Sequence, residues 1–237
     1  MTDAHSHILF GIDDGSSSLK ESIELLKKMK DTGFNNVILT PHYIEGSVFN
    51  ANNIDKMNRY EMLLEELEKQ NIDINIYLGN EIFISNNILS NIKRNQIFSL
   101  NNTKYLLIEL PFHNKILNLE DIIYEIKVKG YIPIIAHPER YTYFQENKEL
   151  INKLREEDVL FQANYASILG YYGKSSEKLM KYMLKKGYID YLGTDIHHLN
   201  KSYVLDNFSK IKKHIIKYTG SDYFNQIIDN CNSLIND

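Results

Sequence analysis

The sequence predicts an α/β fold in which short parallel strands alternate with helices around one core. Two observations support this prediction. Short apolar runs recur along the chain, and the segments between them carry apolar residues at helical spacing. Most of the runs also end in a side chain that can bind a metal ion. The runs and their endings are 2–4 before His5 and His7, 36–40 before His42, 74–79 before Glu81, 105–108 before Glu109, 132–136 before His137, and 189–193 before Asp195 and His197.

The helices between these strands carry their own start and stop signals. Ser18 and Glu21 have capping-box spacing, and Gly33 supplies a stop, so a helix is expected between them. Similar apolar periodicity recurs in three further segments and again near the C-terminus. The further expected helices are 54–69, 119–128 and 178–186, with one or two amphipathic helices after residue 202.

One more apolar run, 159–162, leads into Asn164 and so ends in an amide instead of a strong metal ligand. The alternation of strand and helix predicts βαβ units with right-handed crossovers and therefore a parallel sheet, closed or open. The carboxyl ends of such strands meet at one edge, where α/β enzymes place their chemistry. We therefore expect the metal-binding side chains to converge there.

Composition excludes several other classes of protein. The net charge of −4 and the scattered lysines predict no nucleic-acid binding. No apolar run approaches the ~18 residues of a membrane span, and no signal peptide precedes the first strand. The lone cysteine, Cys231, fits a reducing compartment and is expected to be a packing residue. We expect a single domain over 1–237, located in the cytoplasm and not inserted in a membrane.

The ligand types indicate which metals the edge would hold. His5 and His7 are two residues apart, so on a strand both imidazoles point to the same side, and Asp195 and His197 repeat this spacing. With Asp14 the candidates number nine, too many for one tetrahedral ion but suitable for two or three ions with bridging carboxylates. Imidazole and carboxylate ligands without thiolate favour Mn²⁺, Fe²⁺ or Zn²⁺. The chemistry expected of such a cluster is hydrolysis, above all of a phosphoester.

The arrangement of these blocks resembles a known family. The blocks are 1–15, 40–42, 79–81, 107–109, 135–141 and 193–197, of which the last two read Ile-Ala-His-Pro-Glu-Arg-Tyr and Gly-Thr-Asp-Ile-His. In order and spacing they resemble the polymerase-and-histidinol-phosphatase superfamily. More closely, they resemble its bacterial manganese-dependent protein tyrosine phosphatases of capsule and exopolysaccharide operons.

The resemblance implies a distorted (β/α)₇ barrel, similar to a TIM barrel, with a trinuclear metal centre. It implies Mn²⁺ as the cofactor, with Fe, Zn or Mg as alternatives. The expected sharing of ligands is His5, His7, Glu81 and Asp195 at a first ion, Glu81, Glu109 and His137 at a second, and Asp14, His42 and His197 at a third.

The resemblance also implies an activity, which is hydrolysis of phosphotyrosine by direct attack of a metal-bridging hydroxide. Arg140 lies three positions after His137, and we expect its guanidinium to bind the substrate phosphate as the catalytic arginine. The family often has a second arginine shortly after the last Asp-x-His. Residues 198–202 contain none, and Lys201 is expected to supply that charge as a point donor.

The partner that the resemblance implies is the phosphotyrosine-bearing C-terminal tail of a bacterial tyrosine kinase that controls polysaccharide export. Two alternatives stay open at the level of sequence. The same metal cluster would serve a small-molecule phosphoesterase, such as a histidinol phosphatase. A non-catalytic module that binds phosphorylated tails is the alternative from another class of protein.

Overall fold

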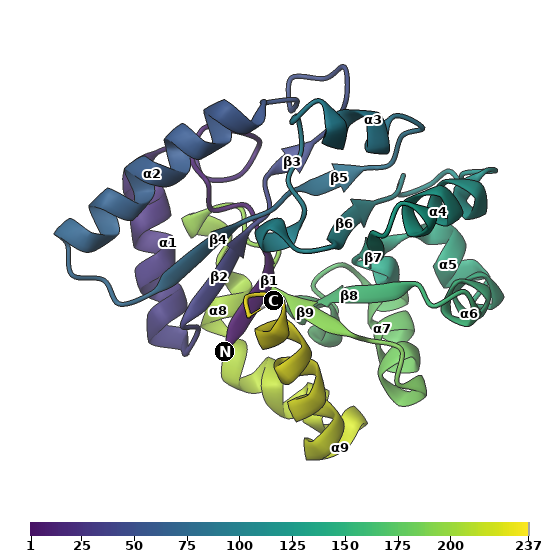
Figure 1. The fold of residues 1–237 in the computed structure, drawn as a ribbon. Helices are drawn as coiled ribbons and strands as arrows, with labels where there is room; N and C mark the ends of the chain where they lie inside the picture. Colours follow the sequence, from purple (N-terminus) through teal and green to yellow (C-terminus); the bar gives the residue numbers. More distant parts are fainter. Residues whose placement is uncertain (237) are drawn as a thin grey trace.

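The computed structural model describes residues 1–236, whose strands form a curled parallel sheet with helices on its outer side (Figure 1). All the strand pairs are parallel, and the strands fall into two hydrogen-bonded sets. The first set, in spatial order, is β1 (Thr2–Ser6), β2 (Asn36–Leu39) and β4 (Asn75–Leu78). The second is β3 (His42–Tyr43), β5 (Glu81–Phe83), β6 (Tyr105–Glu109), β7 (Ile132–Ala136), β8 (Leu160–Asn164) and β9 (Tyr191–Gly193).

Two of the expected strands, 36–40 and 74–79, are each followed by a short second strand after a break. Thr40 and Pro41 separate β2 from β3, and Gly79 and Asn80 separate β4 from β5. The side chain of Asn80 bridges the two breaks, because its Nδ2 donates to the carbonyl oxygen of Pro41 at 2.8 Å. Its Oδ1 accepts from the buried ammonium of Lys56, also at 2.8 Å. The expected strands ended at residues 40 and 79, and the sequence did not predict that each would resume as β3 and β5, which carry His42 and Glu81.

The same region explains why the barrel is distorted. A short 3₁₀ helix, η1 (Leu100–Asn102), packs against both β4 and β6, which are not hydrogen-bonded neighbours in the described chain. Gly79 is required for this contact, since a Cβ there would lie 2.7 Å from the side chain of Leu100. The sheet is therefore opened on this side by an inserted element.

On the opposite side the sheet is joined by bonds between β1 and the residues after β9. The amide nitrogen of Asp195 donates to the carbonyl oxygen of His5 at 2.9 Å. The amide nitrogen of Thr194 donates to Oδ1 of Asp3 at 2.7 Å, and its hydroxyl donates to Oδ2 at 2.6 Å. When β2 with β3, and β4 with β5, are each counted as one strand, the described residues form seven strands. The expected distorted (β/α)₇ fold is confirmed.

The helices follow the expected signals closely. In α1 the hydroxyl of Ser18 accepts from the amide of Glu21, and Gly33 ends the helix in the left-handed region at φ 104°. The helix expected from residue 178 begins four residues earlier. The helices of this part of the chain are α1 (Leu19–Thr32), α2 (Asn53–Lys69), α3 (Ile88–Lys93), α4 (Leu119–Val128), α5 (Thr142–Glu146), α6 (Glu149–Glu156) and α7 (Lys174–Lys186).

The C-terminal segment forms α8 (Tyr203–Asp206) and α9 (Phe208–Ser233), and α9 packs against β1 and β9 (Figure 1). Gly220 interrupts α9 with a non-helical backbone at φ 75°. Cys231 lies on the buried face of α9, where its sulfur accepts from the backbone of β9. The two expected covering helices and the packing role of the cysteine are thus observed.

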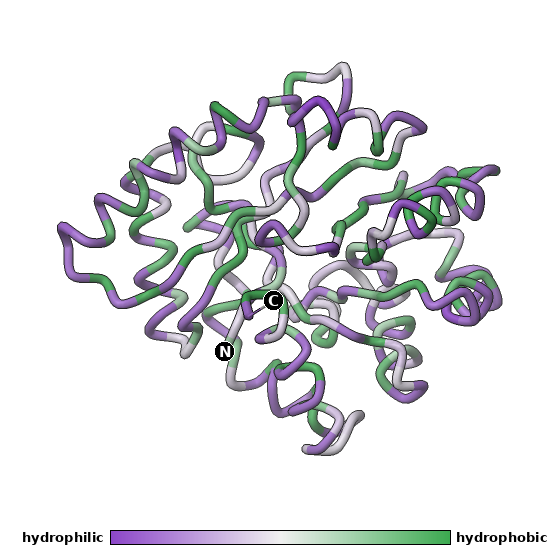
Figure 2. Tube along the Cα trace, viewed as in Figure 1, coloured by the Kyte–Doolittle hydropathy of each residue, from purple (hydrophilic) through white to green (hydrophobic). Residues whose placement is uncertain are grey.

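Hydrophobic residues concentrate on the strands and on the inner faces of the helices, and polar residues lie outside (Figure 2). This is the burial expected for a parallel sheet covered by crossover helices. Among the described helices, none combines the length and the apolar character needed to span a bilayer.

Candidate metal centre

The structure brings the nine candidate ligands together at the carboxyl ends of the strands. Six of them form what we call the inner group, because each residue is at most 8% exposed. Three form the outer group, whose side chains are between 12% and 54% exposed. The inner group is His5, His7, Glu81, Glu109, His137 and Asp195, and the outer group is Asp14, His42 and His197.

Glu81 is the centre of the cluster. Its Oε1 lies 2.7 Å from Nε2 of His137. Its Oε2 lies 3.1 Å from Nε2 of His7, 3.2 Å from Nε2 of His5 and 3.1 Å from Nδ1 of His42. One carboxylate therefore faces four imidazoles that come from the ends of three strands, β1, β3 and β7.

Several buried polar atoms at this point have no hydrogen-bond partner among the described residues. They are Oε2 of Glu81, Nδ1 of His42 and Nδ1 of His137; the first two lie 3.1 Å apart but are not aligned as a hydrogen bond. Leaving such an atom buried without a partner costs roughly 1–3 kcal/mol. Divalent cations would take lone pairs from just these atom types, so the donor set fits a metal centre.

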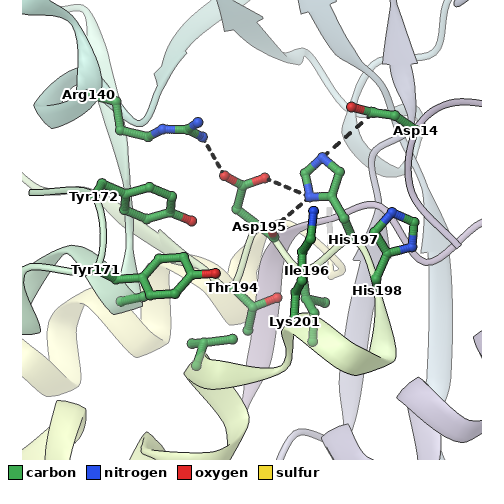
Figure 3. A pocket seen from close by; sticks show the side chains of 12 residues that line it. Asp14, Arg140, Tyr171, Tyr172, Thr194, Asp195, Ile196, His197, His198 and Lys201 are labelled. Atoms are coloured by element: carbon green, nitrogen blue, oxygen red, sulfur yellow. Dashed lines mark hydrogen bonds and ion pairs between the residues drawn. The ribbon is translucent and has the colours of Figure 1, made fainter.

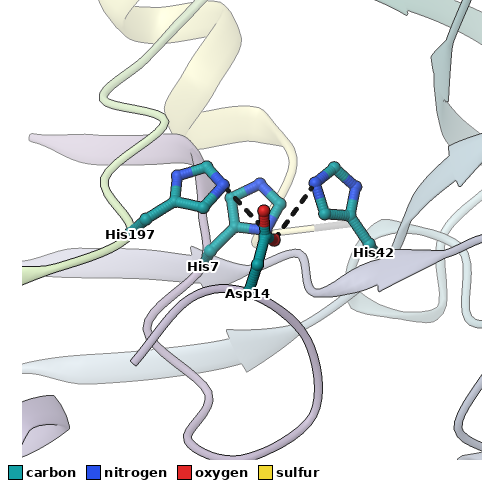
Figure 4. A group of neighbouring side chains, drawn as sticks. All are labelled: His7, Asp14, His42 and His197. Carbon is teal, nitrogen blue, oxygen red and sulfur yellow. Dashed lines mark ion pairs between the residues drawn. The ribbon is translucent and has the colours of Figure 1, made fainter. Parts of the chain in front are cut away.

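The outer group continues the cluster toward solvent (Figure 4). Oδ1 of Asp14 lies 3.6 Å from Nε2 of His42 and 3.7 Å from Nε2 of His197. The ring of His197 stacks on that of His7, with centroids 4.0 Å apart. Asp14 comes from the loop after β1, and the neighbouring Asp13 of this loop bonds the amide of His42 in β3.

Ligand atoms close enough to share an ion form three overlapping groups. These groups differ from the expected partition, because His7 and His42 each belong to two groups, and His137 and Asp195 belong to none. Asp195 nevertheless lies near the first group, since its Oδ1 is 3.5 Å from Nε2 of His7. The groups are His5, His7 and Glu81; His42, Glu81 and Glu109; and His7, Asp14, His42 and His197.

The charges of the cluster are interdependent. Burial opposes the ionisation of Glu81, but the surrounding imidazoles outweigh it and hold the pKa of Glu81 well below its usual range. Glu109 has the opposite shift: burial and the nearby carboxylates of Glu81 and Asp195 raise its pKa to about 9. Burial, with the neighbouring charge of Arg140, lowers the pKa of His137 to about 4. A neutral imidazole of this kind offers the lone pair that a metal requires.

Two inner ligands have unusual backbone conformations. His137 and Asp195 have φ values of 31° and 52°, in the left-handed region that residues with a Cβ seldom adopt. Each follows the end of a strand and begins a turn. Such conformations cost on the order of 1–3 kcal/mol and persist where the surrounding structure imposes them, often at functional sites.

Residues that support the ligands were not identified from the sequence. Oδ2 of Asp13 accepts from Nδ1 of His7 at 2.7 Å and from the amide of His42 at 2.8 Å. Gln162 and Asn164 form a second set of contacts behind the inner group. The adjacency of Asp13 to Asp14 gave no sign of which carboxylate faces outward. For the amides, the only signal was their alternate spacing on one strand.

A pocket of about 390 Å³ opens beside the cluster (Figure 3). Nη1 of Arg140 donates to Oδ2 of Asp195 at 2.7 Å. The guanidinium carbon of Arg140 lies 4.5 Å from the ring centroid of Tyr172 and 4.7 Å from that of Phe112. The arginine is thus held between two aromatic faces, while Lys201 also lines the pocket.

A parallel barrel with imidazoles and carboxylates gathered at its carboxyl end defines the class of metal-dependent hydrolases. Comparison with known proteins narrows this class. Residues 1–236 match the family model for capsular polysaccharide synthesis proteins of the CpsB/CapC type. The chain therefore belongs to the CpsB/CapC family.

Individual relatives agree with this assignment. CapC of Staphylococcus aureus is 33% identical over 215 residues, covering 90% of this chain and 84% of its own. The tyrosine-protein phosphatase YwqE of Bacillus subtilis is 33% identical over 199 residues, covering 84% of this chain and 78% of its own. A structure from work on the metal-dependent tyrosine phosphatases YwqE and CpsB matches with a TM-score of 0.93 and 30% identity, covering 100% of this chain and 94% of the other.

Proposed function

We propose that this protein is a metal-dependent protein-tyrosine phosphatase that hydrolyses phosphotyrosine monoesters. The observation that carries the proposal is the carboxylate of Glu81, which faces four imidazoles beside a pocket lined by an arginine. Membership of the CpsB/CapC family and the names of the relatives support the same activity.

We further propose that all nine clustered side chains bind metal and that Mn²⁺ is the native ion. Their mixture of imidazole and carboxylate oxygen supports a borderline or hard divalent ion, and Fe²⁺, Zn²⁺ and Mg²⁺ are the alternatives. Bound divalent ions would polarise the phosphoryl oxygens and activate a water molecule for attack on phosphorus.

Arg140 would orient the phosphoryl group. Its Nη1 is engaged by Asp195, and its plane is fixed by the rings of Phe112 and Tyr172, so its remaining N–H donors are directed without a further loss of side-chain entropy. Lys201 would add a second positive charge at the mouth of the pocket. Both residues lie where an anionic substrate would approach the cluster.

A mechanism through a cysteinyl phosphate is not supported by the thiol of this chain. Cys231 lies on the buried face of α9, and burial raises the pKa of its thiol to about 12. It would be protonated and out of contact with substrate at neutral pH. Attack by an activated water is therefore the chemistry we propose.

The proposed substrate is the phosphorylated C-terminal tail of a bacterial tyrosine kinase, encountered in the cytoplasm. The reducing compartment fits the free buried thiol of Cys231. The description of the family, capsular polysaccharide synthesis, supports a substrate that belongs to that process.

The test compares phosphate release from a phosphotyrosine peptide, histidinol phosphate and a nucleotide in the presence of Mn²⁺. We expect the peptide to have the highest kcat/KM. Equal or faster turnover of histidinol phosphate would replace the proposal with a small-molecule phosphoesterase. Tight peptide binding without any phosphate release would replace it with a binding module.

Two variants separate metal binding from substrate binding. His137→Ala is expected to lose metal and activity together, measured by elemental analysis and phosphate release. Arg140→Ala is expected to keep its metal but lose most turnover, on the order of 10²-fold or more, because a charge-assisted contact to the phosphoryl group is removed. Arg94→Ala, at an exposed arginine beyond α3, is the matched control and should match the wild type.

A further inference from the structure

Two buried amides on β8 connect a ligand from the first strand with a ligand from beyond the last strand. Nδ1 of His5 lies 2.8 Å from Oε1 of Gln162. Nε2 of Gln162 donates to Oδ1 of Asn164 at 3.0 Å, and Nδ2 of Asn164 donates to Oδ2 of Asp195 at 2.6 Å. All four residues are buried, and His5, Gln162 and Asn164 are 0% exposed.

The direction of every hydrogen bond in this series is set by the carboxylate of Asp195 at its end. Asp195 also accepts from the guanidinium of Arg140, so it is a carboxylate and can only accept. Asn164 must then present its NH₂ group to Asp195 and its oxygen to Gln162. Gln162 in turn presents its NH₂ group to Asn164 and its oxygen to His5.

The consequence for His5 is a fixed tautomer. Because Nδ1 faces an amide oxygen, it must carry the proton, and Nε2 keeps its lone pair. That Nε2 is the atom that faces the cluster, at 3.2 Å from Oε2 of Glu81. At the other end, Oδ2 of Asp195 is saturated by two donors, which leaves Oδ1 directed at the imidazoles of the inner group.

The fold makes space for this connection at one glycine. β9 pairs with β8 on one side and contacts β1 on the other, so a side chain on β9 would separate Gln162 from His5. Gly193 occupies that position. A Cβ there would lie 2.5 Å from Cβ of His5 and 2.8 Å from Nε2 of Gln162, and both distances are too short for a side chain at this position.

We propose that Gln162 and Asn164 are positioning residues, which select the metal-binding tautomer of His5 and aim the carboxylate of Asp195 at the same point. This proposal rests on the metal centre proposed above. The two amides touch neither the pocket nor a reacting atom; they act through the ligands. Supporting partners of this kind typically change metal affinity by about 10- to 100-fold.

The test uses two substitutions that nearly preserve side-chain volume, Gln162→Met and Asn164→Leu. We expect each to weaken Mn²⁺ binding by about 10- to 100-fold in competition with a chelator. Asn53→Leu removes another buried amide, whose partners are Asn95 and the backbone of Ile97, and serves as the control. It should lower the melting temperature and leave Mn²⁺ affinity unchanged.

A second readout follows the tautomer in metal-free protein, by ¹⁵N–¹H correlation of labelled histidines at alkaline pH. The wild type should carry the His5 proton on Nδ1. In Asn164→Leu the ring proton of His5 should be shared between the Nδ1 and Nε2 tautomers, although Asn164 reaches His5 only through Gln162. A merely structural role for the amides would not produce this change.

Two results would overturn the proposal. One is a wild-type His5 protonated on Nε2. The other is Mn²⁺ affinity within about twofold of the wild type in both variants, with only their melting temperatures lowered. Failure of the wild type itself to bind Mn²⁺ would contradict the proposed function, and the tautomer measurement would still decide the role of the amides.

Discussion

The inner and outer groups of the cluster differ in how the protein supports them. In the inner group His5 and His7 each bond a buried partner behind the ring, Gln162 and Asp13 respectively. In the outer group, Nδ1 of His197 lies 3.0 Å from a carbonyl oxygen of its own turn. The difference indicates that the inner ligands are fixed before metal arrives, while the outer ligands can adjust to ion and substrate.

The largest effect is expected at the point where the two groups meet. Glu81→Gln keeps the size of the side chain but removes the charge that faces four imidazoles. Losing about 4 kcal/mol of charge stabilisation would reduce kcat/KM by about 10³-fold. Phosphate release and metal content measure this. Glu65→Gln, an exposed residue of α2, should behave as wild type, and a Glu81→Gln protein with full metal content would show that the two groups do not depend on this carboxylate.

Removing the metal should cost stability in proportion to its affinity. At a free ion concentration 100-fold above Kd, binding raises the free energy of unfolding by about 2.7 kcal/mol. For a chain of this size that corresponds to a melting temperature higher by roughly 5–10 °C. Thermal melts with and without chelator test this, and re-addition of Mn²⁺ should restore the transition. An unchanged melting temperature would mean that the inner group does not hold ions tightly.

A single outer ligand should matter less than an inner one. His197→Ala removes one imidazole whose side chain is 24% exposed, and water can replace it. We expect about 10-fold to 100-fold lower kcat/KM, the loss of at most one ion, and little change in the melting temperature of metal-free protein. His5→Ala is the inner counterpart. If the two variants lost the same number of ions, the distinction between the groups would fail.

The smallest effect on activity is expected from Lys56, whose side chain bonds Asn80 at the strand breaks before His42 and Glu81; its predicted effect is on stability. Burial lowers the pKa of Lys56 from 10.5 to about 7. Between these values the unfolded chain holds a proton that the folded protein has released, so stability should rise with pH from about 7 toward 10. Below pH 7 both states are protonated, and the folded state carries the full cost of the buried charge.

Urea unfolding at a series of pH values measures this slope. Lys56→Met should flatten the rise by on the order of a few kcal/mol across the window, because no group with a shifted pKa remains at that position. The same slope in both proteins would show that Lys56 is charged in the fold. The hydrogen bond from Lys56 to Asn80 would then stabilise the breaks as an ionic contact.

The candidate ligands could be identified from the sequence, but the residues that support them could not. A His or Glu that follows an apolar run is visible, because strands and their ends have a periodic signature. Gln162 and Asp13 have no such signature, because their role depends on which atom of a distant ligand they face. The short strands β3 and β5 were also not predicted, since the apolar runs end at residues 40 and 79, and only the contacts of Asn80 with Pro41 and Lys56 show how the chain continues.

The bonds that join Thr194 to Asp3 link residues 191 positions apart. Until the residues beyond β9 have been synthesised, β1 can pair with β2 but not with Thr194 or Asp195. His5 therefore acquires its full set of partners only after almost the whole chain has left the ribosome, and we expect the metal centre to assemble after that point.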